Sequence, residues 1–196
     1  MEQVESKTGP AVRDILHSNS KKVNKNADFI EPVNDQELGD DLVDPSNEPE
    51  GGNETCFETS LSYCDSFLGD DGCVELMQRV RTSSCLVRLD LRGNHIGCVG
   101  GESIADALRV NRSIEELTLE WNNIGNYDNV VRGLASSLEI NQTLRYLDMR
   151  NNRIGPEGGA SLARALRSNC GLLKLDIRWN EIGIKGGRLL ALSLEE

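Results

Sequence analysis

The fold is decided by a nine-residue segment, Leu144-Arg145-Tyr146-Leu147-Asp148-Met149-Arg150-Asn151-Asn152. It has apolar residues at its first, fourth and sixth positions and asparagine at its ninth. The same pattern recurs in Leu86–Asn94, Ile114–Asn122 and Leu172–Asn180, so that the four starts are separated by 28, 30 and 28 residues. Each copy continues into Ile-Gly. Four copies in phase exclude a chance match, and we expect one structural unit repeated along the chain.

Each repeat has a physical reason to begin with a short strand. Alternate apolar residues such as Leu89 and Leu91 point to the same side of an extended chain, so equivalent strands can stack in parallel over one core. The recurrent asparagine follows the strand, where its amide can bond backbone groups of its own turn and of the neighbouring turn. Apolar residues at helical spacing, such as Ile104 and Leu108, predict a helix that returns over the back of each strand.

This arrangement is the leucine-rich-repeat pattern. We predict an α/β fold, a leucine-rich-repeat solenoid that forms a segment of a horseshoe, with parallel strands on the concave face and helices on the convex face. Its four regular repeats start near residues 86, 114, 144 and 172. A degenerate N-terminal repeat at about 56–85 precedes them, because Leu61 and Cys64 match the end of the strand pattern.

The chain divides into two parts of different composition. Residues 1–55 contain 13 acidic and five basic residues and four of the five prolines, so we predict a disordered acidic tail. Residues 56–196 form the predicted repeat domain. They end inside the expected helix of the last repeat, with no polar capping unit after it. Since solenoids need a polar terminal face for solubility, we expect either a continuation of the protein beyond this end or association through it.

The repeats resemble those of a known class. Units of 28–30 residues with the strand Leu-Asp-Leu-Arg-x-Asn, as in Leu89–Asn94, resemble the ribonuclease-inhibitor-like class of leucine-rich-repeat proteins. The segments Ser113–Asn122 and Leu175–Asn180 are similar to the family of leucine-rich repeat-containing protein forty-five. This resemblance implies a non-enzymatic protein-interaction scaffold of the cytoskeletal or centrosomal linker type, located in the cytoplasm. The alternative is a Ran-type GTPase-activating protein or another ribonuclease-inhibitor-like regulator.

Composition and motifs argue against several other functions. The net charge of −11 disfavours nucleic acid as a partner, and no apolar run is long enough to span a membrane. The two histidines, His17 and His95, lie in different parts of the chain, so we expect no catalytic residue, no metal site and no cofactor. Without a secretory signal, the six cysteines are expected to be reduced and mostly buried.

A partner-binding surface is expected on the concave strand face. Because Leu89 and Leu91 point inward, the residues between and beside them must point outward, and Arg92, Glu120 and Arg150 can form a row of alternating charge. Tryptophan and arginine are the usual hot-spot residues of interfaces. The candidate partner-binding residues are Arg92, Glu120, Trp121, Tyr146, Asp148, Arg150, Arg178 and Trp179. Asp148 is expected to face solvent. The alternative for Trp121 and Trp179 is that they only cover the edge of the core.

Overall fold

The computed structural model describes residues 59–194. The predicted disordered tail, residues 1–55, and the predicted start of the repeat domain at residue 56 lie outside these residues. Strands and helices alternate along the described chain in the order β1 (Ser60–Ser62), α1 (Gly69–Thr82), β2 (Arg88–Asp90), α2 (Cys98–Val110), β3 (Glu116–Thr118), the 3-10 helix η1 (Ile124–Asn126), α3 (Asp128–Ile140), β4 (Tyr146–Asp148), α4 (Pro156–Ser168), β5 (Lys174–Asp176) and α5 (Gly183–Ser193).

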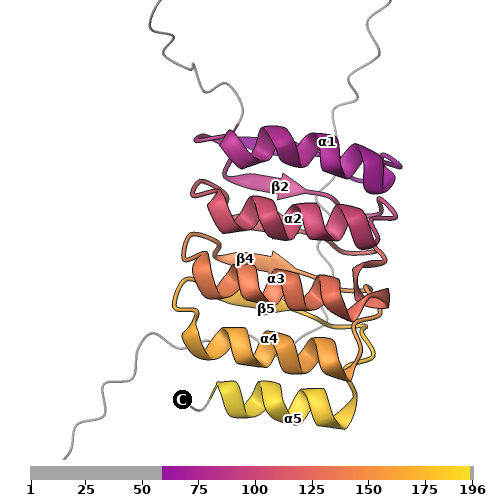
Figure 1. Ribbon diagram of the computed structural model, residues 1–196, viewed down its shortest axis with the longest axis vertical. Helices are drawn as coiled ribbons and strands as arrows, with labels where there is room; N and C mark the ends of the chain where they lie inside the picture. Colours follow the sequence, from indigo (N-terminus) through magenta and orange to yellow (C-terminus); the bar gives the residue numbers. More distant parts are fainter. Residues whose placement is uncertain (1–58, 195–196) are drawn as a thin grey trace, which may run out of the picture. The chain divides into compact units, whose positions relative to one another are not determined.

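The five strands form one parallel sheet in sequence order, and the helices form a second layer along one side of it (Figure 1). Equivalent residues are in register, so that Leu89 lies beside Leu117, which lies beside Leu147. Packed helices need about 8–10 Å between axes, whereas strands need only about 4.8 Å. The strand layer therefore lies on the inside of the curve, and the predicted α/β leucine-rich-repeat solenoid is confirmed.

The core lies between the two layers. Leu91, Leu119 and Met149, which occupy the sixth position of the repeat, are fully buried. Two glycines allow neighbouring helices to approach closely. A Cβ atom on Gly101 of α2 would overlap the Val130 side chain of α3, and one on Gly159 of α4 would lie 2.7 Å from the Cγ2 atom of Ile182. Small residues at these positions are therefore a packing requirement.

The recurrent asparagines bond backbone groups in two adjacent turns, as predicted. The Oδ1 atom of Asn122 accepts hydrogen bonds from the amides of Asn94 (3.2 Å) and Ile96 (2.9 Å) in the preceding repeat. Its Nδ2 atom donates to the carbonyls of Leu91 (2.9 Å) and Leu119 (3.0 Å). Each asparagine thus links its own turn to the turn before it.

Four of the five cysteines in residues 59–194 are free thiols, as expected, but the expectation that most are buried is wrong. Cys73 is buried, and burial raises the pKa of its thiol to about 11. Cys98 is only partly buried, and Cys64 and Cys170 are exposed. Cys85 is disulfide-bonded, which contradicts the expected reduced state. A short apolar context therefore did not identify buried cysteines in these turns.

None of the helices that the structure describes is both long enough and apolar enough to cross a membrane.

Candidate functional site

The outer surface of the sheet, here called the strand face, consists of the first and third residues of each strand and the second and third residues after it. An Asp-x-Arg pair recurs on it. In β2 the Asp90 carboxylate accepts hydrogen bonds from the Arg92 guanidinium at 2.7 and 3.0 Å and from the Arg92 backbone amide at 3.1 Å. The same contacts join Asp176 to Arg178 at the end of β5. The aspartate therefore closes the turn after the strand and also orients the arginine.

A cluster of four charged residues, here called the Arg150 cluster, lies at the centre of the strand face. Atom Nη2 of Arg150 lies 2.6 Å from Glu120 Oε2 and 2.7 Å from Asp148 Oδ2, and its Nε atom lies 3.6 Å from Asp176 Oδ2. One guanidinium thus contacts carboxylates from three successive repeats. The hydrogen bond to Asp148, opposed by burial, raises the pKa of Arg150. Burial disfavours ionised Asp176, but hydrogen bonds from Arg178 outweigh it and lower its pKa.

Tyr146 extends this cluster along β4. Its hydroxyl donates to Asp148 Oδ2 at 3.2 Å, and the ammonium of Lys174 lies 4.8 Å from the centre of its ring. Burial, together with the negative charge of Asp148, raises the pKa of Tyr146 to about 12. The tyrosine is therefore held neutral as a hydrogen-bond donor.

Two expectations for this surface are wrong. Asp148 does not face solvent, because it is only 1% exposed and is enclosed by Arg150 and Tyr146. The row of alternating charge does not extend over three repeats either. Glu120 pairs with Arg150, whereas Arg92 pairs with Asp90 of its own turn at 2.7 Å. Charge pairing within a strand competes with pairing between strands, and the sequence pattern does not show which of them prevails.

The tryptophans lie at the end of the strand face, in a row here called the rim, which consists of Trp121, Asn151 and Trp179. Hydrogen bonds from the amide of Trp121 to the carbonyl of Arg150 (3.1 Å) and from the amide of Asn151 to the carbonyl of Arg178 (3.2 Å) keep these turns in register. Trp121 is 64% exposed and Trp179 is 77% exposed. Side chains this exposed do not cover the edge of the core, so the alternative interpretation loses its support.

The rim has an unusual backbone. Trp121, Asn151 and Trp179 have positive φ angles of 58°, 53° and 60°, and Gly93, at the equivalent position, has 67°. Glycine and asparagine tolerate this left-handed conformation, but a bulky side chain is disfavoured there. The tryptophans therefore occupy positions where the backbone alone would favour other residues.

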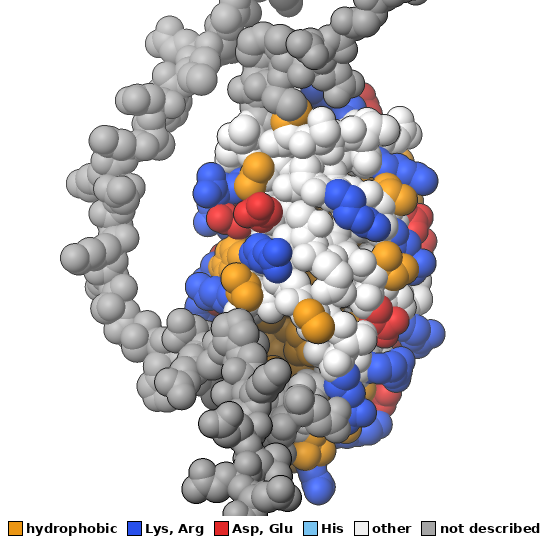
Figure 2. Space-filling view, turned by 90° about the vertical axis from the view of Figure 1, so that its left-hand side faces the viewer, with side chains coloured by type: hydrophobic (Ala, Val, Ile, Leu, Met, Phe, Trp, Pro, Cys, Tyr) orange, Lys and Arg blue, Asp and Glu red, His pale blue; other side chains and the backbone are white. Residues whose placement is uncertain are grey.

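A second asparagine row was missed by sequence reasoning. Asn111, Asn141 and Asn169 end helices α2, α3 and α4. Asn141 donates to the carbonyls of Leu108 (2.8 Å) and Asn111 (3.2 Å) and accepts from the amides of Thr143 and Leu144. The recurrence of Asn-x-Ser/Thr/Gly-Ile/Leu at one phase was the available signal. This row stabilises the turns that lead from each helix into the next strand, at the end of the strands opposite the rim. The middle of this side of the molecule is largely uncharged, and many Lys and Arg side chains lie along its borders (Figure 2).

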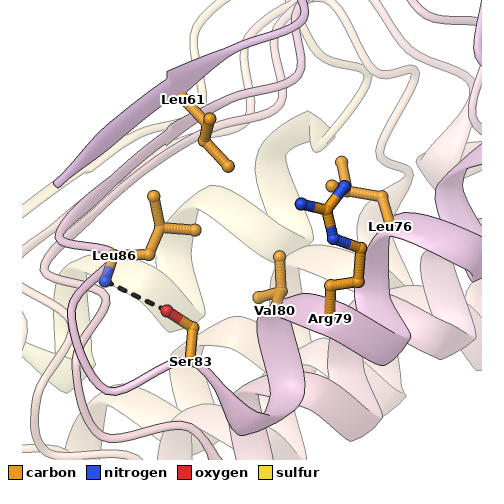
Figure 3. Close-up of a pocket in the computed structure, with 6 residues that line it drawn as sticks. All are labelled: Leu61, Leu76, Arg79, Val80, Ser83 and Leu86. Atoms are coloured by element: carbon orange, nitrogen blue, oxygen red, sulfur yellow. Dashed lines mark hydrogen bonds between the residues drawn. The ribbon is translucent and has the colours of Figure 1, made fainter. Parts of the chain in front are cut away.

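Elsewhere the described residues offer no competing site. A cavity of about 190 Å³ lies between β1 and α1 and is lined by Leu61, Leu76, Arg79, Val80, Ser83 and Leu86 (Figure 3). Its serine hydroxyl accepts a hydrogen bond from the Leu86 amide at 3.2 Å, so it closes a turn. Within residues 59–194 no group of three or more His, Cys, Asp or Glu residues could hold a metal ion.

Comparisons with known proteins agree with this architecture. Residues 82–105, 110–126, 141–163 and 168–191 match the family described as Leucine Rich repeat. Leucine-rich repeat-containing protein 45 of Gallus gallus is 39% identical over 108 residues, which cover 55% of this chain and 16% of that protein. Capping protein, Arp2/3 and myosin-I linker protein 3 of Homo sapiens is 32% identical over 97 residues, which cover 48% of this chain and 7% of that protein. The chain therefore matches less than a fifth of the length of either relative.

Solved structures show the same fold. The structure described as Leiomodin-1 Actin-Binding Site 2 superimposes with a TM-score of 0.60 at 22% identity, covering 72% of this chain and 83% of that chain. The tropomodulin C-terminal domain of Caenorhabditis elegans gives a TM-score of 0.61 at 14% identity, covering 72% and 84% of the two chains.

Proposed function

Because residues 82–191 of this chain consist of leucine-rich repeats, we propose that it is a non-enzymatic scaffold that binds a protein partner on its strand face. The observation that carries this proposal is the outward display of arginine and tryptophan by successive repeats. Arg92 and Arg178 expose 43% and 55% of their side chains, and Trp121 and Trp179 are still more exposed. Arginine and tryptophan are the residue types enriched in interface hot spots.

The other predicted residues, Glu120, Tyr146, Asp148 and Arg150, hold one another in place on the strand face. Glu120, Tyr146 and Asp148 hold Arg150 and one another by hydrogen bonds. A rigid, internally paired base lowers the entropy lost when a partner binds. In this proposal Arg92, Arg178 and the tryptophans contact the partner. Asp90 orients Arg92, and the Arg150 cluster holds Arg178 and the turn of Trp121.

The proposed partner belongs to the cytoskeleton or to a centrosomal linker. The relative from Homo sapiens is by its name a linker of capping protein, Arp2/3 and myosin-I. The segments that end in Trp121-Asn122 and Trp179-Asn180 resemble the family of leucine-rich repeat-containing protein forty-five, and this resemblance implies a centrosomal partner. Both relatives are much longer than this chain, so their partners are carried over only as part of this proposal. The corresponding location is the cytoplasm.

Affinity capture from cell extract tests the proposal. With the full chain as bait, replacing Trp121 and Trp179 by Asn and Arg178 by Ala should abolish capture of a cytoskeletal or centrosomal protein. Arg164→Ala, on the exposed side of α4, is the matched control and should retain it. Equal capture by both variants would exclude these strand-face residues as the binding site.

Acceleration of GTP hydrolysis by Ran in the presence of the purified chain would instead support the alternative regulatory function.

A further inference from the structure

The indole N–H groups of Trp121 and Trp179 have no hydrogen-bond partner within the described residues. An indole N–H can only donate. Arg178, which precedes Trp179 in the chain, still exposes 55% of its side chain. The nearby acceptors are already occupied. Glu120 accepts from Arg150 and Asn151. The rim therefore presents aromatic surface and hydrogen-bond donors.

The spacing of the tryptophans is set by the sheet. They belong to β3 and β5 turns, separated by the single turn that carries Asn151. With strands about 4.8 Å apart, their backbones lie about 9.6 Å apart. A polyproline II helix repeats every three residues, which is about 9.3 Å at 3.1 Å per residue. One turn of such a helix therefore matches the distance between the two backbone positions that carry the indoles.

The chemistry of a proline-rich segment also matches. Proline has no backbone N–H, and the carbonyls of a polyproline II helix are not used internally. Such a segment offers acceptors and apolar rings, which complement the donors and aromatic faces of the rim. Its preformed conformation also reduces the entropy lost on binding.

We propose that Trp121 and Trp179 bind a proline-rich segment of the partner in the polyproline II conformation, with one indole for each end of a three-residue turn. Asn151 lies between them as the floor of the site. This inference rests on the proposed scaffold function and specifies what the partner presents to the rim. It also accounts for tryptophan at two left-handed positions where Gly93 and Asn151 show what the backbone prefers.

Intrinsic tryptophan fluorescence of the full chain tests this directly, because the chain contains only these two tryptophans. A synthetic peptide of repeated Ala-Pro-Pro units should quench or shift the emission saturably. The same peptide with alanine at every proline should not. Trp121→Asn and Trp179→Asn should each weaken binding about tenfold, with the remaining tryptophan as reporter.

Phe67→Asn is the matched control. Phe67 is 79% exposed, has a φ angle of 54° and lies outside the rim, where its ring stacks on His95. It should bind the peptide as the unchanged chain does. Circular dichroism melts establish that each variant is folded, and Trp→Gly replaces any Asn variant that is not.

Three results would overturn the inference: no saturable change up to millimolar peptide, equal binding of the alanine peptide, or equal weakening by Phe67→Asn. If the peptide fails but capture of the cellular partner still requires Trp121 and Trp179, the scaffold proposal stands and only the proline-rich segment is wrong. If neither peptide binding nor capture depends on them, both proposals fail.

Discussion

Trp121 and Asn122 are adjacent in the chain, yet the tryptophan is 64% exposed and the asparagine is 4% exposed. The asparagine belongs to the interior of the turns, where its amide satisfies backbone groups of two repeats. The tryptophan belongs to the strand face and rim, where its indole has no hydrogen-bond partner in the described chain. In the four regular repeats the interior positions keep the same chemical character, apolar or asparagine, whereas the rim positions differ in size and polarity. This contrast separates the residues that maintain the solenoid from those available to a partner.

The largest effect is expected in the interior. Leu147→Asp should lower the free energy of unfolding by about 5 kcal/mol, because it buries a charge without a partner. Leu173→Asp, at a side chain that is 59% exposed, should change it by about 0.5 kcal/mol or less. Urea melts of both variants measure the difference. Comparable losses would mean that the sheet does not bury the fourth position of the repeat.

The Arg150 cluster should fall between interior and surface. Arg150→Glu leaves four carboxylates without their central cation and should cost about 3 kcal/mol, whereas Arg164→Glu on α4 should have little effect. The pH dependence should also invert. Asp176, whose pKa is lowered in the folded chain, contributes stability above its unfolded pKa that is lost on acidification. In the variant, mutual repulsion raises the folded pKa values, so stability should increase as the pH falls from 7 to about 5.

The second asparagine row, in the turns between helices and strands, should also contribute to stability. Asn141→Ala removes four hydrogen bonds to backbone groups and should cost about 2 kcal/mol. Asn123→Ala removes a partly exposed side chain and should cost about 0.5 kcal/mol or less. Thermal melts compare the stability of the two variants. An Asn141→Ala variant as stable as the unchanged chain would show that the second asparagine row does not stabilise the solenoid.

Tyr146 should report a smaller, pH-dependent effect. Because its pKa is raised to about 12, its contribution to stability is complete below the unfolded value near 10 and is lost as the pH rises toward 12. Phenolate absorbance of the folded chain should show one of the three tyrosines ionising late. Tyr146→Phe should remove that late step. Its persistence would mean that another tyrosine is responsible.

The smallest effect on stability is expected at the rim. Trp121→Asn and Trp179→Asn relieve a disfavoured left-handed conformation, so unfolding free energies should stay within about 0.5 kcal/mol or rise slightly. Circular dichroism melts measure this. A loss of more than about 2 kcal/mol would show that the tryptophans belong to the interior after all.

The sequence repeat predicted the buried positions of the solenoid correctly, and the predictions that were wrong concern particular surface residues. The phase of Leu89, Leu117 and Leu147 and the role of Asn122 were predicted correctly, because a repeated unit can bury its apolar stripe in only one way. The exposure of Asp148 and the row through Arg92 were predicted wrongly, because each side chain pairs with a residue two positions away in its own repeat, a contact that strand alternation alone does not reveal. The second asparagine row was not predicted, because its hydrogen-bond partners at the end of the preceding helix become apparent only in the structure.

The sequence by itself determined that this protein is a stack of strand–turn–helix units with a defined inner side, since the spacing of leucine and asparagine is a local property repeated in phase. Only the tertiary structure decided which charges pair, which asparagines link neighbouring turns and which aromatic side chains remain in solvent. Those outcomes depend on competition between groups that are about 26–33 residues apart in the chain but adjacent in the stack, as in any solenoid whose repeats contact only their neighbours. That competition is resolved by distance and burial, which the one-dimensional pattern does not contain.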